Sequence, residues 1–313
     1  MSAIIDFIVK AVSLGTVFLF GSTGETLTEK SGHLNLGIPG IMCFGALGGC
    51  VGVSLVGSVT FLTVIVAILT SFLFAGFLGA IYSFLTVSLR ANQNVTGLTI
   101  TTFGVGLTNF FGPRVDDSAF FTASRQHFSH IFGFYESLGA FGELFLSYGI
   151  LVYLAIIIAV LTSLFLNKNK KGLHLRAVGE SPATADAAGI NVTAYRYIAT
   201  VVGSGIAGLG GLFYIMDYLG GSWEYTIDAM GWLAIALVIF TVWRPSLGII
   251  GSILFGALYI LAFKVPIATR MINLLQMIPY VVTIIVLIFT SIFGSKNVQP
   301  PASLGLNYFR EER

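Results

Sequence analysis

The sequence has little charge. Only 10% of its 313 residues are Asp, Glu, Lys or Arg, whereas a soluble domain usually carries about 25%. The chain is 56% hydrophobic, and its mean hydropathy is +0.90. This composition excludes water as the solvent for most of the surface. A net charge of +2 without a long basic stripe gives no reason to expect a nucleic-acid partner.

Cysteines and enzymatic motifs are also scarce. Cys43 and Cys50 lie in an apolar, glycine-rich run at a spacing typical of neither a metal site nor a redox pair, so we expect packed free thiols. The sequence contains no G-x-x-x-x-G-K-[ST] phosphate loop, no H-E-x-x-H and no G-x-S-x-G motif. We therefore expect no enzymatic activity and no metal or cofactor in this chain. Any dependence on ATP would therefore have to come from a separate subunit.

Long hydrophobic runs fill most of the chain. Crossing a bilayer core of about 30 Å takes roughly 20 apolar residues in a helix. Runs of about this length cover residues 4–22, 36–57, 60–89, 97–112, 144–166, 194–219, 230–243, 246–263 and 273–293. The fourth and seventh are short, as in broken or re-entrant helices that protein shields from lipid. We predict an all-α, polytopic transmembrane helical bundle of about nine segments, with one membrane domain over residues 1–300 and a tail over 301–313.

The first run has no cleavage site of a signal peptide, so we expect a retained helix. It contains Asp6 and Lys10. A lysine inside a span needs a partner or access to the interface.

Basic residues predict the orientation, because cytoplasmic loops hold an excess of lysine and arginine. If the 167–193 loop is cytoplasmic, alternation places the N-terminus outside and the C-terminus inside. The basic residues outside are then Arg114, Arg125, Lys264 and Arg270, and the acidic connection that holds Glu224 and Asp228 also lies outside. Those inside are Lys30, Arg90, Lys168, Lys170, Lys171, Arg176, Arg196, Arg244, Lys296, Arg310 and Arg313.

The longest external segment in this topology covers residues 113–143. It mixes charged and aromatic residues and is either a docking surface or an interfacial helix. We interpret His127 and His130 as interfacial side chains rather than metal ligands, because no third ligand lies near them in the sequence.

Glycines cluster in the second and sixth runs. Small residues let helix backbones approach closely in a membrane, and we favour this packing role over contact with a solute. The clusters are Gly45, Gly48, Gly49 and Gly52, and Gly203, Gly205, Gly208, Gly210 and Gly211.

The first of three polar segments, Gly21 to Gly40, reads GSTGETLTEKSGHLNLGIPG. We expect its glycines and Pro39 to break the helix. It is either a broken-helix element lining a pathway, with Asn35 and Gly37 near a polar solute, or an ordinary cytoplasmic loop in which Lys30 neutralises Glu25 or Glu29. We favour the pathway for residues 35–40.

The second polar segment, Arg90 to Gly97, reads RANQNVTG. The amides of Asn92, Gln93 and Asn94 can hydrogen-bond a neutral solute without the desolvation cost of a buried ion. They either line a pathway or form a plain polar turn.

The third polar segment, Lys168 to Tyr197, reads KNKKGLHLRAVGESPATADAAGINVTAYRY. We predict a short alanine-rich helix that Ser181 caps, Pro182 starts and Gly189 ends. An exposed helix between two membrane spans needs a protein partner, and its alanine face favours close packing into a groove.

These segments together resemble the permeases of the branched-chain amino acid and simple-sugar class of ABC importers, and most closely nucleoside-type permeases. The residues that carry the resemblance are GETLTEKSGHLNLGIPG (24–40), Asn92 to Gly97, LRAVGESPATADAAGINVTAYR (175–196), Ala207 to Gly211 and the Trp243-Arg244-Pro245 turn. Pro39 departs from the family pattern.

The resemblance implies a multi-pass protein of the bacterial cell membrane. Its partners would be a second, usually non-identical permease, a cytoplasmic ATPase with two nucleotide-binding domains often fused in one chain, and an external substrate-binding lipoprotein of the basic-membrane-protein type. It also implies that the segment over 180–189 is the coupling helix that docks into the ATPase. The residues assigned to coupling are Glu180, Ser181, Pro182, Ala183, Ala187 and Gly189.

Alternating access is the mechanism that the resemblance implies, with nucleosides as the first substrate class, simple sugars the second and branched-chain amino acids the third. One rival is a secondary carrier that uses Asp217 or Lys10 as an ion site. A membrane-embedded enzyme is the other. Co-purification of an ATPase and a lipoprotein would separate these classes.

Overall fold

The protein is described here from a computed structural model over residues 3–57, 60–129, 131–223, 227–264, 274–293 and 299–309. Every regular element in these ranges is a helix, which confirms the all-α prediction. The long helices are α1 (Ala3–Glu29), α2 (Ile38–Val56), α3 (Leu62–Ser83), α4 (Gln93–Phe111), α7 (Ile150–Lys168), α10 (Val192–Phe213), α11 (Ile227–Phe240), α12 (Pro245–Lys264) and α14 (Ile278–Phe293). Each predicted hydrophobic run overlaps one of them.

Shorter elements connect the long helices. The π-helical turns are η1 (Phe84–Ser88), η3 (Ser124–Phe128) and η5 (Tyr214–Tyr218), and the 3₁₀ turns are η2 (Gly112–Arg114) and η4 (Tyr135–Leu138). The short α-helices are α5 (Phe120–Ala123), α6 (Gly139–Leu146), α8 (Lys170–Glu180) and α9 (Pro182–Ala187).

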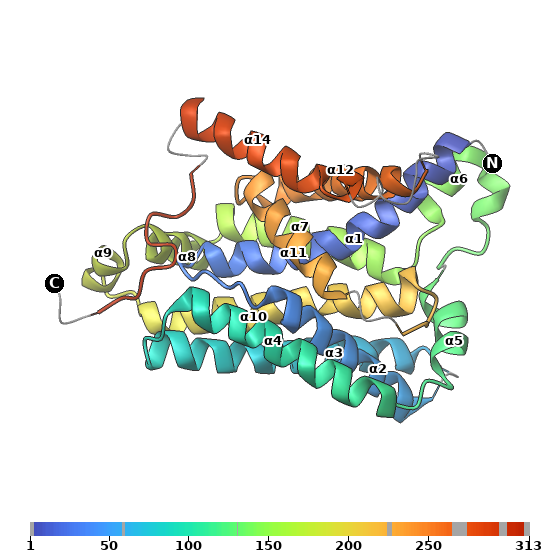
Figure 1. The fold of residues 1–313 in the computed structure, drawn as a ribbon, viewed down its shortest axis with the longest axis horizontal. Coiled ribbons are helices and arrows are strands. Elements are labelled where there is room, and N and C mark those ends of the chain that lie inside the picture. Colours follow the sequence, from blue (N-terminus) through green and yellow to red (C-terminus); the bar gives the residue numbers. More distant parts are fainter. Residues whose placement is uncertain are drawn as a thin grey trace.

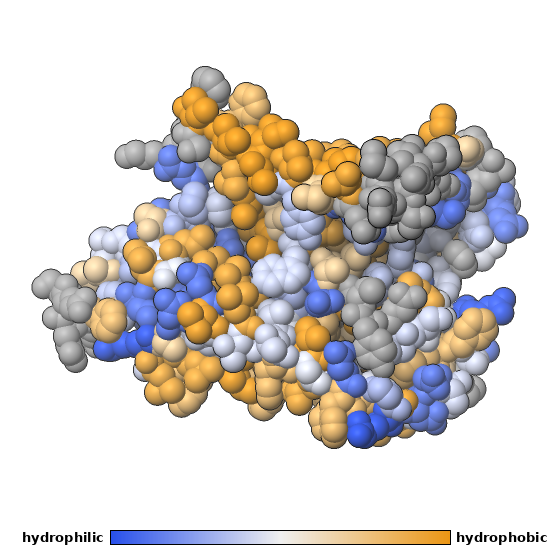
Figure 2. Space-filling view, viewed as in Figure 1, coloured by the Kyte–Doolittle hydropathy of each residue, from blue (hydrophilic) through white to orange (hydrophobic). Residues whose placement is uncertain are grey.

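Helix length and hydropathy fit a multi-pass membrane protein. Within the described ranges, α1, α2, α3 with η1, α7, and α10 with η5 are long and apolar enough to cross a bilayer. The apolar stretches of α11, α12 and α14 are shorter. With 19 residues, α4 is long enough to cross but is more polar than these spans. Figure 2 shows hydrophobic side chains along α14 and along the helices at the opposite edge of the view.

Glycines bring the central helices together, as the sequence predicts. A Cβ on Gly24 of α1 would lie 2.2 Å from the carbonyl oxygen of Gly203 on α10. A Cβ on Gly45 of α2 would lie 2.4 Å from the Cα of Gly208. Helix α10 therefore approaches both α1 and α2 backbone to backbone, which only glycine permits.

The two other expectations for polar or reactive side chains in the spans are also confirmed. Lys10 pairs with Asp6 one helical turn earlier, at 2.9 Å. Cys43 and Cys50 are free and buried in the core.

The two ends of the bundle differ. The N-terminus, α5 and α6 lie at one end of the molecule, and α8, α9 and the C-terminal tail lie at the other (Figure 1). Five basic residues that the topology places inside line two cavities beside α8 and α9; they are Lys30, Arg90, Arg176, Arg196 and Arg244. The side of the membrane that each end faces stays a prediction. Glu224, His130, Arg270, Lys296, Arg310 and Arg313 lie outside the described residues.

The break in the first polar segment lies later than predicted. Helix α1 continues through Gly21 and Gly24 to Glu29, because these glycines pack against neighbouring helices instead of ending their own. The break covers residues 30–37. Pro39 lies in the first turn of α2, where its missing N–H costs nothing.

Candidate functional site

The break between α1 and α2 is a buried bend. Gly32 has a φ of +80°, which turns the chain away from α1. His33 follows, and its ring nitrogens lie 2.8 Å from the Thr200 hydroxyl on α10 and 2.7 Å from the Thr86 hydroxyl in η1. Burial, together with the nearby charge of Arg196, lowers the pKa of His33 to about 3. The imidazole is therefore neutral at neutral pH and joins α10 to the end of α3.

Asn35 and Gly37, which we predicted to lie in a pathway, lie side by side in this bend. The Asn35 backbone N–H donates to the Glu25 carboxylate at 3.0 Å, and its side-chain oxygen accepts from the Gly37 N–H at 2.9 Å. The Asn35 amide nitrogen and the second Glu25 oxygen have no partner among the described residues. Buried polar atoms without partners are unfavourable, so water or a solute reaching this bend would find a donor and an acceptor free. Contact with a solute stays a prediction.

Glu25 and Glu29 do not belong to a loop, so that alternative for the first segment is wrong. Both lie buried in the last turns of α1. The Glu29 carboxylate accepts a hydrogen bond from the indole N–H of Trp243 instead of being neutralised by Lys30 alone. Trp243 belongs to the turn between α11 and α12, where it and Val242 have φ values of +54° and +53°. The end of α1 is therefore fastened to this strained turn.

The three amides of the second segment have different environments. Helix α4 begins at Gln93, four residues before the predicted run, because the Asn92 side chain caps it by accepting the Val95 N–H at 3.1 Å. Gln93 is buried; its side-chain oxygen accepts the Leu34 N–H at 2.8 Å. The Asn94 side chain is exposed. The structure brings Gln93 to the bend next to Asn35, whereas Asn92 is used as a cap and Asn94 faces outward.

The predicted exposed helix is present as α9. The Ser181 hydroxyl accepts the Thr184 N–H at 3.4 Å, Pro182 occupies the first turn, and Gly189 with a φ of +81° ends the helix. Ala183 and Ala187 are exposed. The caps are those that the sequence predicts, and the alanine face is open.

A second helix precedes α9, and the sequence did not predict it. The basic stretch over 170–180 forms α8, which the Asn169 side chain caps by accepting the Lys171 N–H at 3.0 Å. Glu180 is the last residue of α8 and is exposed.

The C-terminal tail over residues 299–309 packs on this end of the bundle. Its backbone binds α8 and the bend, because the Ser303 N–H donates to the Gly179 carbonyl at 3.0 Å and the Gly305 N–H donates to the Gly32 carbonyl at 3.3 Å. Its side chains continue the contacts. Asn307 donates to the Arg90 carbonyl at 2.7 Å, and Tyr308 donates to the Asp186 carboxylate of α9 at 2.8 Å.

Sequence reasoning missed these contacts of the tail. The available signal is weak: apolar and aromatic residues at Leu304, Leu306, Tyr308 and Phe309 in an otherwise polar ending. The tail contacts the bend, α8 and α9 together.

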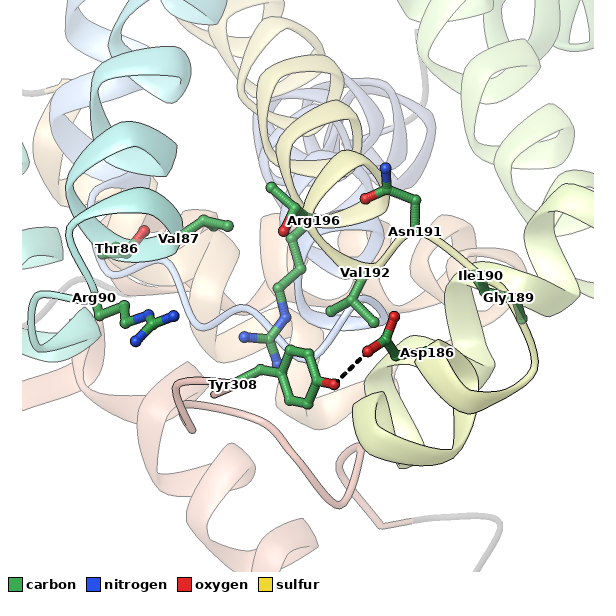
Figure 3. Close-up of a pocket in the computed structure, with 11 residues that line it drawn as sticks. Thr86, Val87, Arg90, Asp186, Gly189, Ile190, Asn191, Val192, Arg196 and Tyr308 are labelled. Carbon is green, nitrogen blue, oxygen red and sulfur yellow. Dashed lines mark hydrogen bonds between the residues drawn. The ribbon is translucent and has the colours of Figure 1, made fainter. Parts of the chain in front are cut away.

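Two polar cavities flank α8 and α9. The first has a volume of about 350 Å³, and Figure 3 shows Arg90, Arg196 and Tyr308 around it, with Asp186 on the α9 side. The second has a volume of about 450 Å³ and is lined by Lys30, Arg176, Glu180 and Arg244, among others.

The remaining candidate residues are those that a metal site or the ion site of a secondary carrier would use. Within the described ranges, no three His, Cys, Asp or Glu side chains gather as a metal site would require. Asp217 lies half-buried in η5, close to Gly149 at the start of α7. Lys10 is already paired with Asp6.

Comparison with known proteins identifies the kind of chain to which this architecture belongs. A sequence model described as the permease component of the branched-chain amino acid transport system matches residues 7–289. No solved structure gives a significant match.

Three curated relatives cover nearly the whole chain. A putative glucose ABC transporter permease of Haloferax volcanii is 32% identical over 96% of each chain. A nucleoside ABC transporter permease of Lactococcus lactis is 31% identical over 95% of this chain and 94% of its own. A guanosine ABC transporter permease of Bacillus subtilis is 30% identical over 93% of this chain and 92% of its own.

Proposed function

The chain belongs to the family of permease components of branched-chain amino acid transport systems, and we propose that it imports nucleosides as one half of a translocation pathway. It is a transmembrane permease subunit of the ABC transporter class. Proteins of this family are generally transport subunits rather than enzymes. Its bundle of apolar helices fits that role.

Two observations support a nucleoside as the solute. Two of the full-length relatives carry names that specify nucleoside or guanosine transport. In this chain, the amide nitrogen of Asn35 in the bend and one oxygen of Glu25 in the last turns of α1 have no hydrogen-bond partner among the described residues, and they suit the donors and acceptors of a neutral polar solute. A simple sugar is the second candidate, because another full-length relative is named as a putative glucose permease.

We expect three kinds of protein partner. A second, non-identical permease would complete the pathway, and an external lipoprotein would deliver the solute. A cytoplasmic ATPase, with duplicated nucleotide-binding domains, would hold ATP and Mg²⁺.

The observation that carries the ATPase contact is the exposed face of α9. Ala183 and Ala187 present a surface without long side chains, and Ser181 and Gly189 fix where the helix begins and ends. A short helix of this kind can enter a groove on a partner without displacing bulky groups.

Movement of α9 has a route to the bend. Tyr308 links α9 to the tail, and the Gly305 N–H links the tail to Gly32 in the bend. We expect closure of the ATPases on ATP to move α9 and, through these contacts, the segment that holds Asn35. The two permeases would then open the pathway inward.

Uptake measurements test the substrate. Cells lacking this chain are complemented with its gene, and the uptake of labelled guanosine, glucose and leucine is compared with and without ATP depletion. We expect complementation to restore ATP-dependent guanosine uptake alone. Restored glucose uptake without guanosine uptake would replace the nucleoside with a sugar, and uptake that survives ATP depletion would contradict the ABC mechanism.

A further inference from the structure

The cavity between α9, α10 and the tail has an excess of positive charge. Arg90 and Arg196 contribute two guanidinium groups, and the acidic side chain lining it is Asp186. Because the Asp186 carboxylate already accepts a hydrogen bond from Tyr308, it is directed toward the tail (Figure 3). The arginines approach the cavity from different elements, Arg90 from the turn before α4 and Arg196 from α10.

Arg196 is a buried cation without a carboxylate partner among the described residues. Its side chain is only 3% exposed. One of its nitrogens donates to the Leu306 carbonyl at 3.1 Å, whereas its Nε and Nη2 have no partner. A guanidinium removed from water in this way is strongly unfavourable unless an anion compensates for its charge. Arg196 lines the cavity, which could admit one.

The start of α10 adds to the positive potential. Residues 191–193 line the cavity, and α10 has 22 residues. The Asn191 side chain caps it by accepting the Ala194 N–H at 3.0 Å. The other N–H groups of a first helical turn have no acceptor inside the helix, and the helix dipole favours an anion beside them.

Arg90 is held in place on the opposite wall. Its backbone φ is +58°, a conformation that non-glycine residues adopt only where neighbours enforce it. Asn307 of the tail donates to its carbonyl oxygen at 2.7 Å, and its guanidinium lies 4.7 Å from the centre of the Phe309 ring. The second cation therefore projects from a turn that the tail holds in place.

We infer that this cavity is a binding site for a phosphate group, held between Arg90 and Arg196 at the N-terminus of α10. A phosphate ester carries up to two negative charges and several acceptor oxygens, so it can bind guanidinium groups that approach from different sides. A volume of about 350 Å³ admits a phosphate with part of the molecule that carries it. That molecule is either a soluble phosphate compound, such as a nucleotide, or an anionic lipid headgroup.

Binding to the purified full-length chain tests the site without any transport measurement, so a failure here leaves the proposed function untouched. In one arm, calorimetry in detergent measures the affinity for inorganic phosphate and for AMP. In the other, native mass spectrometry of the chain in phosphatidylcholine nanodiscs containing some phosphatidylglycerol measures retained anionic lipid. The arm that shows saturable binding identifies the source of the phosphate.

Four variants make the test specific. Arg90→Gln removes the exposed cation of the cavity, and Arg196→Gln removes the buried one. Lys171→Gln removes one positive charge at the same end of the molecule but outside both cavities, and Arg176→Gln alters only the second cavity. We expect Arg90→Gln to weaken binding about tenfold or more, as loss of a charge-assisted hydrogen bond does. Lys171→Gln and Arg176→Gln should bind as the unaltered chain does.

Two results would overturn the assignment. One is the absence of saturable binding of phosphate, AMP and phosphatidylglycerol by the unaltered chain. The other is an equal loss of affinity in Arg90→Gln and Lys171→Gln, which would indicate a general effect of charge. Arg90→Gln decides the question even if Arg196→Gln fails to fold, because the Arg90 side chain is exposed.

Discussion

The Tyr308 hydroxyl donates a hydrogen bond to the Asp186 carboxylate over 2.8 Å and so ties the C-terminal tail to α9. The same tail binds Gly32 in the bend and Gly179 in α8 through its backbone. The helix that we propose docks on an ATPase and the segment that we place near the solute are thus connected by one short stretch of chain.

Removing the Tyr308 hydroxyl should therefore weaken coupling. We expect Tyr308→Phe to lower the midpoint of thermal unfolding by only a few degrees, since one hydrogen bond to a charged group is worth about 1.5–3 kcal/mol at most. It should lower the solute transported per ATP hydrolysed more clearly. Tyr153→Phe is the matched control, because the Tyr153 hydroxyl makes a bond of the same length, 2.8 Å, to the Phe145 carbonyl at the other end of the bundle. Equal coupling in both variants would remove the tail from the mechanism.

The contact between α1 and α10 should not tolerate a single added methyl group. A Cβ on Gly203 would lie 2.4 Å from the Gly24 carbonyl oxygen, so the two backbones must separate. We expect Gly203→Ala to destabilise the protein by about 1–3 kcal/mol, as overpacking does. Thermal unfolding in detergent measures this.

Gly106 on α4 supplies the comparison. A Cβ at this position meets nothing within 4 Å, and alanine is a better helix former than glycine by roughly 1 kcal/mol. Gly106→Ala should leave stability unchanged or raise it. A Gly203→Ala protein as stable as Gly106→Ala would contradict the close approach of the two helices.

Gln93 and Asn94 are adjacent amides with opposite expected behaviour. Replacing Gln93 with leucine leaves the Leu34 N–H without its acceptor in a buried position, which should cost about 1–3 kcal/mol. Asn94 is exposed, so Asn94→Leu should leave thermal stability unchanged. If Asn94 lines the pathway, its variant will still lower solute uptake. Stability and uptake that are both unaffected would remove Asn94 from the pathway.

The long helices were predictable because the bilayer imposes a strong pattern on sequence. The caps of α9 at Ser181 and Gly189 could also be predicted from the sequence, since capping depends on local residues alone. The exact end of α1 could not be predicted. Gly21 and Gly24 read as helix breakers, and only the position of α10 and of other neighbours reveals that they serve close packing.

The candidate site depends mostly on contacts between distant residues. Gln93 binds Leu34, Glu29 binds Trp243, and Tyr308 binds Asp186. No local pattern in the sequence encodes such pairs. The amides of the second segment were recognised as polar groups of interest, but their separate environments follow from where α4 begins.

His33 gives stability a pH dependence. Its pKa is about 3 in the folded chain and about 6.5 when exposed, so between these values the unfolded chain binds more protons. Stability from this residue is present above about pH 6.5 and is lost progressively as the pH falls toward 3. The midpoint temperature of thermal unfolding should therefore fall more steeply from pH 7 to pH 5 in the unaltered chain than in His33→Gln. Parallel declines would mean that His33 is not buried in its neutral form.

The coupling ratio of the assembled transporter tests the central claim most directly. Ala187→Arg places a long cation on the exposed face of α9, and Ala177→Arg places the same side chain at an exposed position of α8. With both variants present in the membrane at equal levels, the measurement is the labelled nucleoside imported per ATP hydrolysed. We expect about a tenfold loss in Ala187→Arg and little change in Ala177→Arg, because bulk on α9 blocks entry into a groove on the ATPase. An unchanged ratio in Ala187→Arg would contradict the assignment of α9 as the coupling helix.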